Sequence, residues 1–173
     1  MESISLEDKV NQYKTIPYPS ISNLRPNTTY ATLLYDDFSG NLGELSAVLQ
    51  YVYEHIQFVN YAEISKVMLS IAIQEMRHLD LVGNLIKTLG RQPTFISSMG
   101  ETWSAKDIRY KTGNLQETMT YNIQTEKAAI AGYKKAIGYT KNRDIQKLFD
   151  RIILDEENHI SIFQAIIQKN GVH

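Results

Sequence analysis

The sequence predicts an all-α protein built as a four-helix bundle, in which two antiparallel hairpins are joined by one long crossover. Three observations support this prediction. Four segments carry apolar residues at alternating spacings of three and four, the period of an amphipathic helix. The connections within the first pair and within the second pair are very short, which makes antiparallel neighbours. A longer irregular segment separates the pairs, and strand signals are weak, so we expect essentially no sheet.

Composition narrows the range of functions. The chain has 173 residues, 43% hydrophobic and 21% charged, which suits one domain with a well-buried core. The formal net charge of -1 predicts no nucleic-acid and no anionic-membrane partner. No apolar run approaches the roughly 20 residues that span a bilayer, and the acidic, polar start does not resemble a signal peptide, so we expect a cytoplasmic protein. The absence of cysteine excludes thiolate zinc sites and iron–sulfur ligation, so a metal would need oxygen and imidazole ligands.

Residues 1–35 are predicted to form an extended N-terminal arm, and residues 36–173 the bundle domain. The arm contains Pro17, Pro19 and Pro26 and few periodic apolar positions. We expect it to lie on the bundle or on a partner subunit, with a short helical piece near residues 6–13. Because arms of this kind often exchange between subunits, we expect a homodimer.

The four bundle helices follow the arm in order. They are expected at residues 41–58, 61–89, 114–137 and 142–169. The second, third and fourth helices are followed by Gly90, Gly138 and Gly171, and glycine is a common stop signal for a helix. Residues 90–114 form the crossover, which is long enough to carry the chain back along the bundle.

Two Glu-x-x-His pairs stand in the middle of apolar helix faces. Glu75 and His78 interrupt the apolar stripe of the second helix, and Glu156 and His159 interrupt that of the fourth. Residues three apart share a face of a helix, so a carboxylate and an imidazole from one helix can reach one ion. One such pair would be weak evidence for a metal site, whereas two on core-facing stripes are strong evidence.

The other two helices each add a lone glutamate in the inward register. Glu44 precedes Glu75 by 31 residues, and Glu126 precedes Glu156 by 30 residues. Tyr51 and Tyr133 each follow the lone glutamate by seven residues. The repeat indicates a structural duplication built around one shared site. His55 also lies on the predicted inward face of the first helix, where we expect a core histidine rather than a ligand.

Physical chemistry favours metal binding at this constellation. Four carboxylates in an apolar core are costly, because an unpaired buried ion loses several kcal/mol of hydration or must take up a proton. Two divalent cations offset these charges, and mixed carboxylate and imidazole ligands suit iron and manganese. The alternative is a metal-free structural bundle, in which the glutamates lie near the surface and the histidines are satisfied core groups.

At these residues the chain resembles the ferritin-like superfamily, especially the rubrerythrins and the manganese catalase-like members. The resemblance covers roughly residues 37–170 and implies a centre of two iron or two manganese ions. The implied metal ligands are the bridging Glu75 and Glu156, the terminal Glu44 and Glu126, and His78 and His159 with one ion each. It further implies that Asp155 and Gln74 orient the histidines of the opposite helices. Tyr51 and Tyr133 resemble tyrosines that flank such centres, although aromatic core packing explains them equally well.

The chain also departs from the rubrerythrin pattern. Ile123 stands where rubrerythrins carry an extra ligand glutamate, and there is no cysteine for a rubredoxin-type iron site. We therefore expect an oxidoreductase that acts on hydrogen peroxide or dioxygen, either as a peroxidase with an external electron donor or in a catalase-like cycle. The alternatives are a ferroxidase or iron-storage protein and the metal-free structural bundle, such as a coat component. A storage cage is disfavoured because no fifth helix is expected after the fourth.

Overall fold

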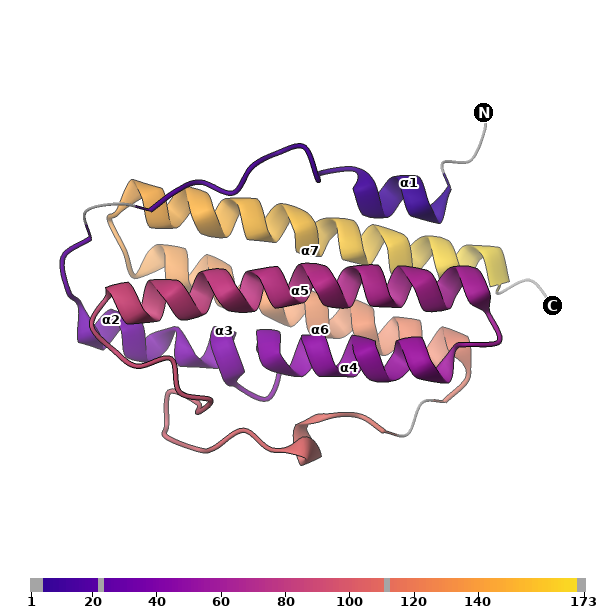
Figure 1. Ribbon diagram of the computed structural model, residues 1–173, viewed down its shortest axis with the longest axis horizontal. Helices are drawn as coiled ribbons and strands as arrows, with labels where there is room; N and C mark the ends of the chain where they lie inside the picture. Colours follow the sequence, from indigo (N-terminus) through magenta and orange to yellow (C-terminus); the bar gives the residue numbers. More distant parts are fainter. Residues whose placement is uncertain (1–4, 22–23, 111–112, 171–173) are drawn as a thin grey trace.

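The bundle consists of four long helices arranged as two hairpins. The computed structural model describes residues 5–21, 24–110 and 113–170. The long helices are α4 (Glu44–Gln57), α5 (Ala62–Thr88), α6 (Leu115–Gly138) and α7 (Arg143–Asn170). Helix α4 packs against α5 and α6 against α7, and the crossover between α5 and α6 runs along the outside of the bundle (Figure 1). The predicted all-α fold, with two hairpins and one crossover, is therefore confirmed.

The remaining elements are short. Within the described ranges, β structure is limited to one isolated bridge between Ile96 and Thr102 in the crossover. A single 3₁₀ turn, η1 (Ala105–Asp107), follows it. None of the described helices combines the length and the apolar character that a membrane crossing requires.

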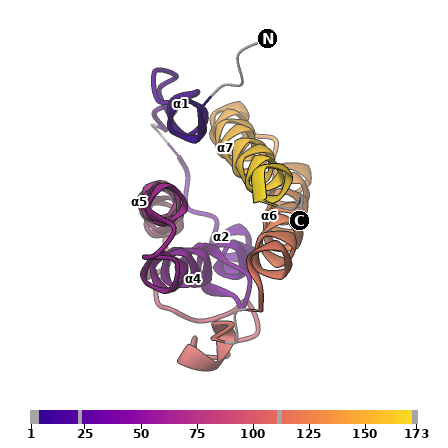
Figure 2. The ribbon, with the colours of Figure 1, turned by 90° about the vertical axis from the view of Figure 1, so that its right-hand side faces the viewer.

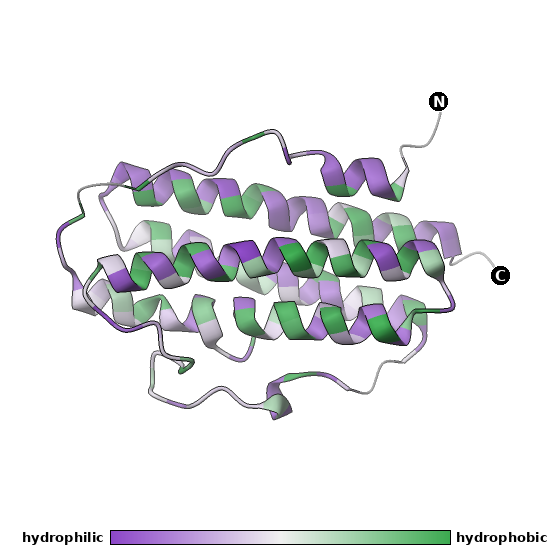
Figure 3. Ribbon diagram, in the orientation of Figure 1, coloured by the Kyte–Doolittle hydropathy of each residue, from purple (hydrophilic) through white to green (hydrophobic). Residues whose placement is uncertain are grey.

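Apolar stripes hold the long helices together. Hydrophobic and hydrophilic residues alternate along each of them at helical spacing (Figure 3). The buried apolar side chains form two clusters at opposite ends of the bundle, one including Ile86 and Phe149 and the other including Met68 and Phe163. Between the two clusters the same helix faces carry buried polar residues. The fold thus places a layer of buried polar residues between two apolar clusters.

The N-terminal segment is partly helical, contrary to the predicted extended arm. Helix α1 (Leu6–Asn11) lies where a short helical piece was expected, and it packs on α5 and α7. Helix α2 (Thr28–Leu33) was missed, and α3 (Tyr35–Ser39) continues the helical course across the expected boundary at residue 35. Both helices form because they bury apolar side chains in the bundle core: Ala31 of α2 is completely covered, and Tyr35 and Phe38 of α3 are buried. Residues 12–21 of the arm lie along α7 (Figures 1 and 2).

A tight turn between α3 and α4 places the start of α4. A Cβ atom on Gly43 would lie 2.6 Å from the Asp36 carbonyl oxygen and 2.8 Å from that of Asp37. Only glycine fits there without a shift of the backbone. Since Gly43 is the N-cap of α4, the turn also positions Glu44, the first residue of that helix.

Candidate metal centre

The six predicted metal ligands converge in the polar layer of the bundle. Each long helix contributes at least one of them, and all are at most 3% exposed; they are Glu44, Glu75, His78, Glu126, Glu156 and His159. Their donor atoms form two groups of four, each within 4.8 Å of one another. One group contains Glu44 and His78 and the other Glu126 and His159, while Glu75 and Glu156 belong to both. This arrangement matches two neighbouring cation positions with two shared carboxylates.

Both histidines direct the same ring nitrogen into the centre. The Nδ1 atom of His78 lies 3.0 Å from Glu75 and 3.1 Å from Glu156. The Nδ1 atom of His159 lies 2.9 Å from each of the same two carboxylates. A neutral imidazole whose Nε2–H donates outward directs the Nδ1 lone pair at these oxygens, which is repulsive unless a cation or a proton lies between them.

Without a cation, the centre must collect protons. Burial and the nearby Glu75 raise the pKa of Glu126 to about 8, and burial raises the pKa of Glu44 well above its usual range. Burial by itself would lower the pKa of His159, but the surrounding carboxylates, Glu75 first, raise it. Burial by itself would raise the pKa of the Glu75 carboxyl group, but His159 and His78 hold this pKa below its ordinary value. The carboxylates of the cluster thus favour positive charge between them.

The orphaned polar atoms at the centre fit a metal site. Glu75 Oε1, both carboxylate oxygens of Glu156 and Nδ1 of His159 are buried without any hydrogen-bond partner. Buried polar groups are almost always satisfied, so four such atoms at one point need an explanation. Hard carboxylate oxygens mixed with imidazole nitrogen are the ligands that iron and manganese accept. Two divalent cations would satisfy these atoms and offset the buried charge.

Two tyrosines hold the outer glutamates across the hairpins. Tyr51 on α4 donates a hydrogen bond of 2.5 Å to Glu126 on α6, and Tyr133 on α6 donates one to Glu44 on α4. Burial, followed by the adjacent carboxylates, raises the pKa of both phenols well above the usual value. Both tyrosines therefore remain neutral donors. Each lone glutamate is oriented by the hairpin to which it does not belong.

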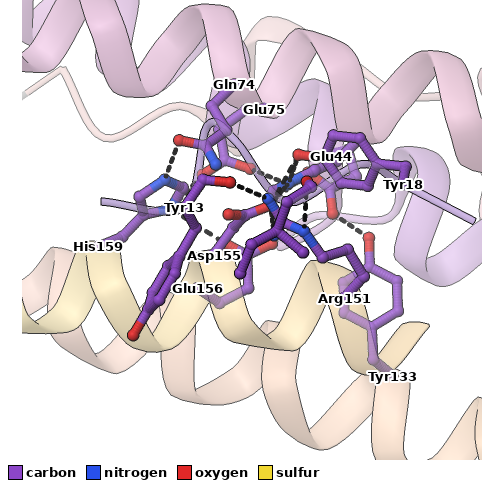
Figure 4. Close-up of polar contacts among 12 residues, drawn as sticks. Tyr13, Tyr18, Glu44, Gln74, Glu75, Tyr133, Arg151, Asp155, Glu156 and His159 are labelled. Atoms are coloured by element: carbon purple, nitrogen blue, oxygen red, sulfur yellow. Dashed lines mark hydrogen bonds and ion pairs between the residues drawn. The ribbon is translucent and has the colours of Figure 1, made fainter. Parts of the chain in front are cut away.

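The outward nitrogens of the two histidines have different partners. His78 Nε2 lies 3.2 Å from Asp155 Oδ2. His159 Nε2 lies 3.3 Å from Gln74 Oε1, and Figure 4 shows these two side chains facing each other. Asp155 also forms an ion pair of 2.6 Å with Arg151. One imidazole therefore faces a carboxylate and the other a neutral amide.

Sequence reasoning missed a further buried carboxyl group, that of Glu54. It is fully buried on α4, where the sequence placed His55 inward. His55 is only half-buried and its Nδ1 lies 2.8 Å from the Ser65 carbonyl oxygen, so the expected core position was wrong by one residue. Glu54 accepts hydrogen bonds from the Gln50 and Asn122 side chains. The one-residue error arose because this face of α4 meets α6 and the crossover rather than α5.

A cavity of about 610 Å³ connects the carboxylate side of the centre with the crossover. At its inner end it is lined by Glu44, Glu75, Glu126 and Glu156 together with Tyr51 and Tyr133. Its outer part is lined by Asp36, Asp37, Glu101 and Asp107, with Lys106 among them. The histidines do not line it. Small molecules can therefore approach the centre from the side of the two lone glutamates.

Fold and site together define the class of this protein: it is a ferritin-like helical bundle whose core carries paired Glu-x-x-His motifs of the di-metal type. Residues 42–167 match the rubrerythrin family, and the chain belongs to that family.

The chain is similar in sequence to two kinds of protein, a manganese catalase and a bacterioferritin. The chain is 24% identical to a probable manganese catalase of Clostridium acetobutylicum, over 84% of this chain and 73% of that protein. It is 31% identical to a bacterioferritin of Desulfovibrio desulfuricans, over 71% of this chain and 67% of that protein.

Solved structures give the same two kinds of protein. The manganese catalase KatB from Anabaena has a TM-score of 0.82 at 26% identity, covering 91% of this chain and 79% of that chain. The Desulfovibrio desulfuricans bacterioferritin has a TM-score of 0.68 at 23% identity and covers 98% of this chain and 87% of that chain, which supports the fold alone.

Proposed function

We propose that this protein is a di-metal oxidoreductase that decomposes hydrogen peroxide, with two manganese or two iron ions at the six-residue centre. Glu75 and Glu156 would bridge the ions, and Glu44 with His78 and Glu126 with His159 would complete the two ligand sets. The observation that carries the proposal is the convergence of unsatisfied carboxylate and Nδ1 atoms at the inner end of a cavity. The similarity to manganese catalases favours manganese.

The chemistry proposed is catalase-like. Two peroxide molecules yield two water molecules and one dioxygen molecule, so peroxide is both oxidant and reductant and no external electron donor is needed. Two redox-active ions held by the six residues would supply the electron exchange with peroxide. A rubrerythrin-like peroxidase is the neighbouring alternative, and it would require an external donor.

The protein's own residues prepare the site for this reaction. Tyr51 and Tyr133 fix the orientation of the terminal carboxylates through their hydrogen bonds. The two apolar clusters exclude bulk water from both ends of the polar layer, which strengthens the electrostatic interactions inside it. Peroxide is small and neutral, so an acidic cavity does not oppose its entry.

The first experiment is metal analysis of protein purified without added metal, combined with an oxygen-electrode assay for peroxide. We expect about two manganese or iron ions per chain and release of one dioxygen for every two peroxides consumed. The double variant Glu75→Ala/Glu156→Ala should lose both. Glu157→Gln is the matched control, because Glu157 follows Glu156 but its side chain is exposed.

Other outcomes of this experiment select other functions. Peroxide consumption only with added reductant would indicate the peroxidase. A wild-type protein that takes up no metal on reconstitution would contradict the proposal and leave the metal-free structural bundle.

A ferroxidase is the second candidate, and the acidic lining of the cavity favours it. Asp36, Asp37, Glu101 and Asp107 would attract Fe²⁺ toward the centre, and a bacterioferritin is among the relatives. Oxidation of Fe²⁺ by dioxygen without peroxide turnover would support this function. Sedimentation separates storage in a large shell from the homodimer that we propose.

The homodimer is supported by an apolar stripe on the outer face of α5. Leu69, Ile73 and Met76 follow helical spacing and are 38%, 59% and 52% exposed. The cytoplasmic location also stays a prediction.

A further inference from the structure

The N-terminal arm reaches the metal centre through one side chain, Tyr18. The arm follows α1 along α7, and Figure 4 shows Tyr18 beside Asp155 and Arg151. Its hydroxyl group donates a hydrogen bond of 2.7 Å to Asp155 Oδ2 and lies 3.2 Å from Nε2 of His78. The Tyr18 ring meets the His78 ring edge-on, with 6.0 Å between the ring centroids. A residue 60 positions away along the chain thus contacts the outward side of a metal-ligand histidine.

A buried arginine fixes the arm in this position. The guanidinium group of Arg151 lies over the Tyr18 ring, 4.6 Å from its centroid, and pairs with Asp155. Its remaining donors bind the arm backbone, with Nε 3.1 Å from the Ile16 carbonyl oxygen and Nη2 2.9 Å from that of Tyr13. The side chain is only 7% exposed. Arg151 therefore ties the carboxylate that faces His78 to the path of the arm backbone.

Among the described residues, the arm contacts the His78 side of the centre and not the His159 side. His159 Nε2 has the Gln74 amide oxygen as its partner, at 3.3 Å, and this partner comes from α5 rather than from the arm. The duplication that relates the two hairpins does not extend to the arm. The two halves of the centre therefore differ in how firmly their histidines are held.

We propose that the arm contributes to the metal centre through Tyr18, a positioning residue that orients His78. Through this contact, docking of the arm on the bundle is coupled to occupation of the cation position on the His78 side. This inference rests on the metal binding in the proposed function. Partners in the outer shell of a metal site fix the orientation of the ligand imidazole, and their loss typically lowers metal affinity by about 10- to 100-fold. Since coupling is reciprocal, a cation at that position must in turn stabilise the docked arm.

The test is Tyr18→Phe, which retains the ring and removes the hydroxyl group. Metal-free protein is titrated with Mn²⁺ alone in competition with a chromophoric chelator, so that two stepwise dissociation constants are obtained. We expect one constant to rise about tenfold or more and the other to stay unchanged. The matched control is Tyr13→Phe. It removes a hydroxyl group that accepts a hydrogen bond from the adjacent Gln12 side chain, and it retains the backbone contact to Arg151.

A second measurement tests directly whether the arm is docked on the bundle. Trypsin cleavage after the exposed Lys14 should slow when Mn²⁺ is added to the wild type and to Tyr13→Phe, but not to Tyr18→Phe. A role in packing alone would change the cleavage rate equally with and without Mn²⁺.

Two results would overturn the inference, and they are distinguishable. Equal stepwise constants in the wild type and Tyr18→Phe would refute it and leave the metal centre intact. A wild type that binds no Mn²⁺ and no Fe²⁺ would overturn the metal centre and the inference together.

Discussion

At the residue scale, burial of an unpaired carboxyl group has consequences for pH. Burial raises the pKa of Glu54 to about 7 from an ordinary 4.5, although hydrogen bonds from Asn122 and Gln50 and the charge of Arg109 act in the opposite direction. The folded state therefore binds more protons than the unfolded state between these values. Folding stability must fall as the pH rises through this window, because the slope follows the difference in bound protons.

Replacing Glu54 by glutamine should remove this penalty. We expect Glu54→Gln to be more stable than the wild type at pH 8, by roughly 3 kcal/mol, because each pKa unit corresponds to about 1.4 kcal/mol. The difference should be smaller at pH 5. Thermal unfolding of metal-free protein at both pH values measures it, with the exposed Glu157→Gln as the control. The same difference at both pH values would show that Glu54 does not titrate in this range.

At the element scale, the position of α4 depends on its first turn. Glu44 is the first residue of α4, and the turn before it has no room for a side chain at Gly43. The hydrogen bond from Tyr133 reaches Glu44 only if α4 starts at this place. The geometry of one half of the centre is thus set by the backbone of a turn.

Gly43→Ala should therefore affect both stability and metal binding. We expect a loss of about 1–3 kcal/mol, typical of a forced steric clash, together with weaker binding of one of the two Mn²⁺ ions. Chemical denaturation and the chelator competition measure these effects. Gly138→Ala is the control, because a Cβ atom there meets nothing within 4 Å. Unchanged Mn²⁺ binding in Gly43→Ala would contradict the role assigned to the turn.

Sequence periodicity predicted the long helices well and the rest less well, for physical reasons. Helix α5 was expected at residues 61–89 and is found at Ala62–Thr88, because apolar stripes and a following glycine are local signals. Helix α2 has no such signal, since its six residues include three threonines and it is stabilised by burial of Tyr30 and Ala31. The contact of Tyr18 with His78 is a tertiary contact without a local pattern. The metal-ligand roles stay predictions.

At the scale of the whole molecule, the centre concentrates negative charge between two apolar clusters. Burial and Glu75 raise the pKa of Glu126 to about 8, and the carboxylates, Glu156 first, raise that of His78 against the effect of burial. Both groups hold protons in the folded state that the unfolded chain would release. The contribution of Glu126 to the stability of the metal-free protein must therefore be largest below its ordinary pKa of 4.5 and fall as the pH rises toward 8. The contribution of His78 must fall in the same direction above its ordinary pKa of 6.5.

Metal binding should reverse this trend. Each Mn²⁺ site occupied at 100 times its dissociation constant adds about 2.7 kcal/mol to the free energy of unfolding, or about 5–10 °C in Tm for a chain of this length. The effect should grow from pH 6 to pH 8, because protons compete with the metal for the same atoms. Calorimetry with chelator and with Mn²⁺ at both pH values checks it. A Tm of the chelated protein that rises with pH would contradict the protonation described.

The hydrogen bonds from Tyr51 to Glu126 and from Tyr133 to Glu44 connect the two hairpins, which has a consequence for how the chain could have evolved. A single hairpin holds one Glu-x-x-His pair and one lone glutamate, whose tyrosine partner belongs to the other hairpin. An ancestral chain of half this length could have assembled the centre only by pairing with a second copy of itself. Fusion of two copies would then have allowed each hairpin to diverge. Gln74 and Asp155, which occupy equivalent positions in the two hairpins, are a divergence of this kind.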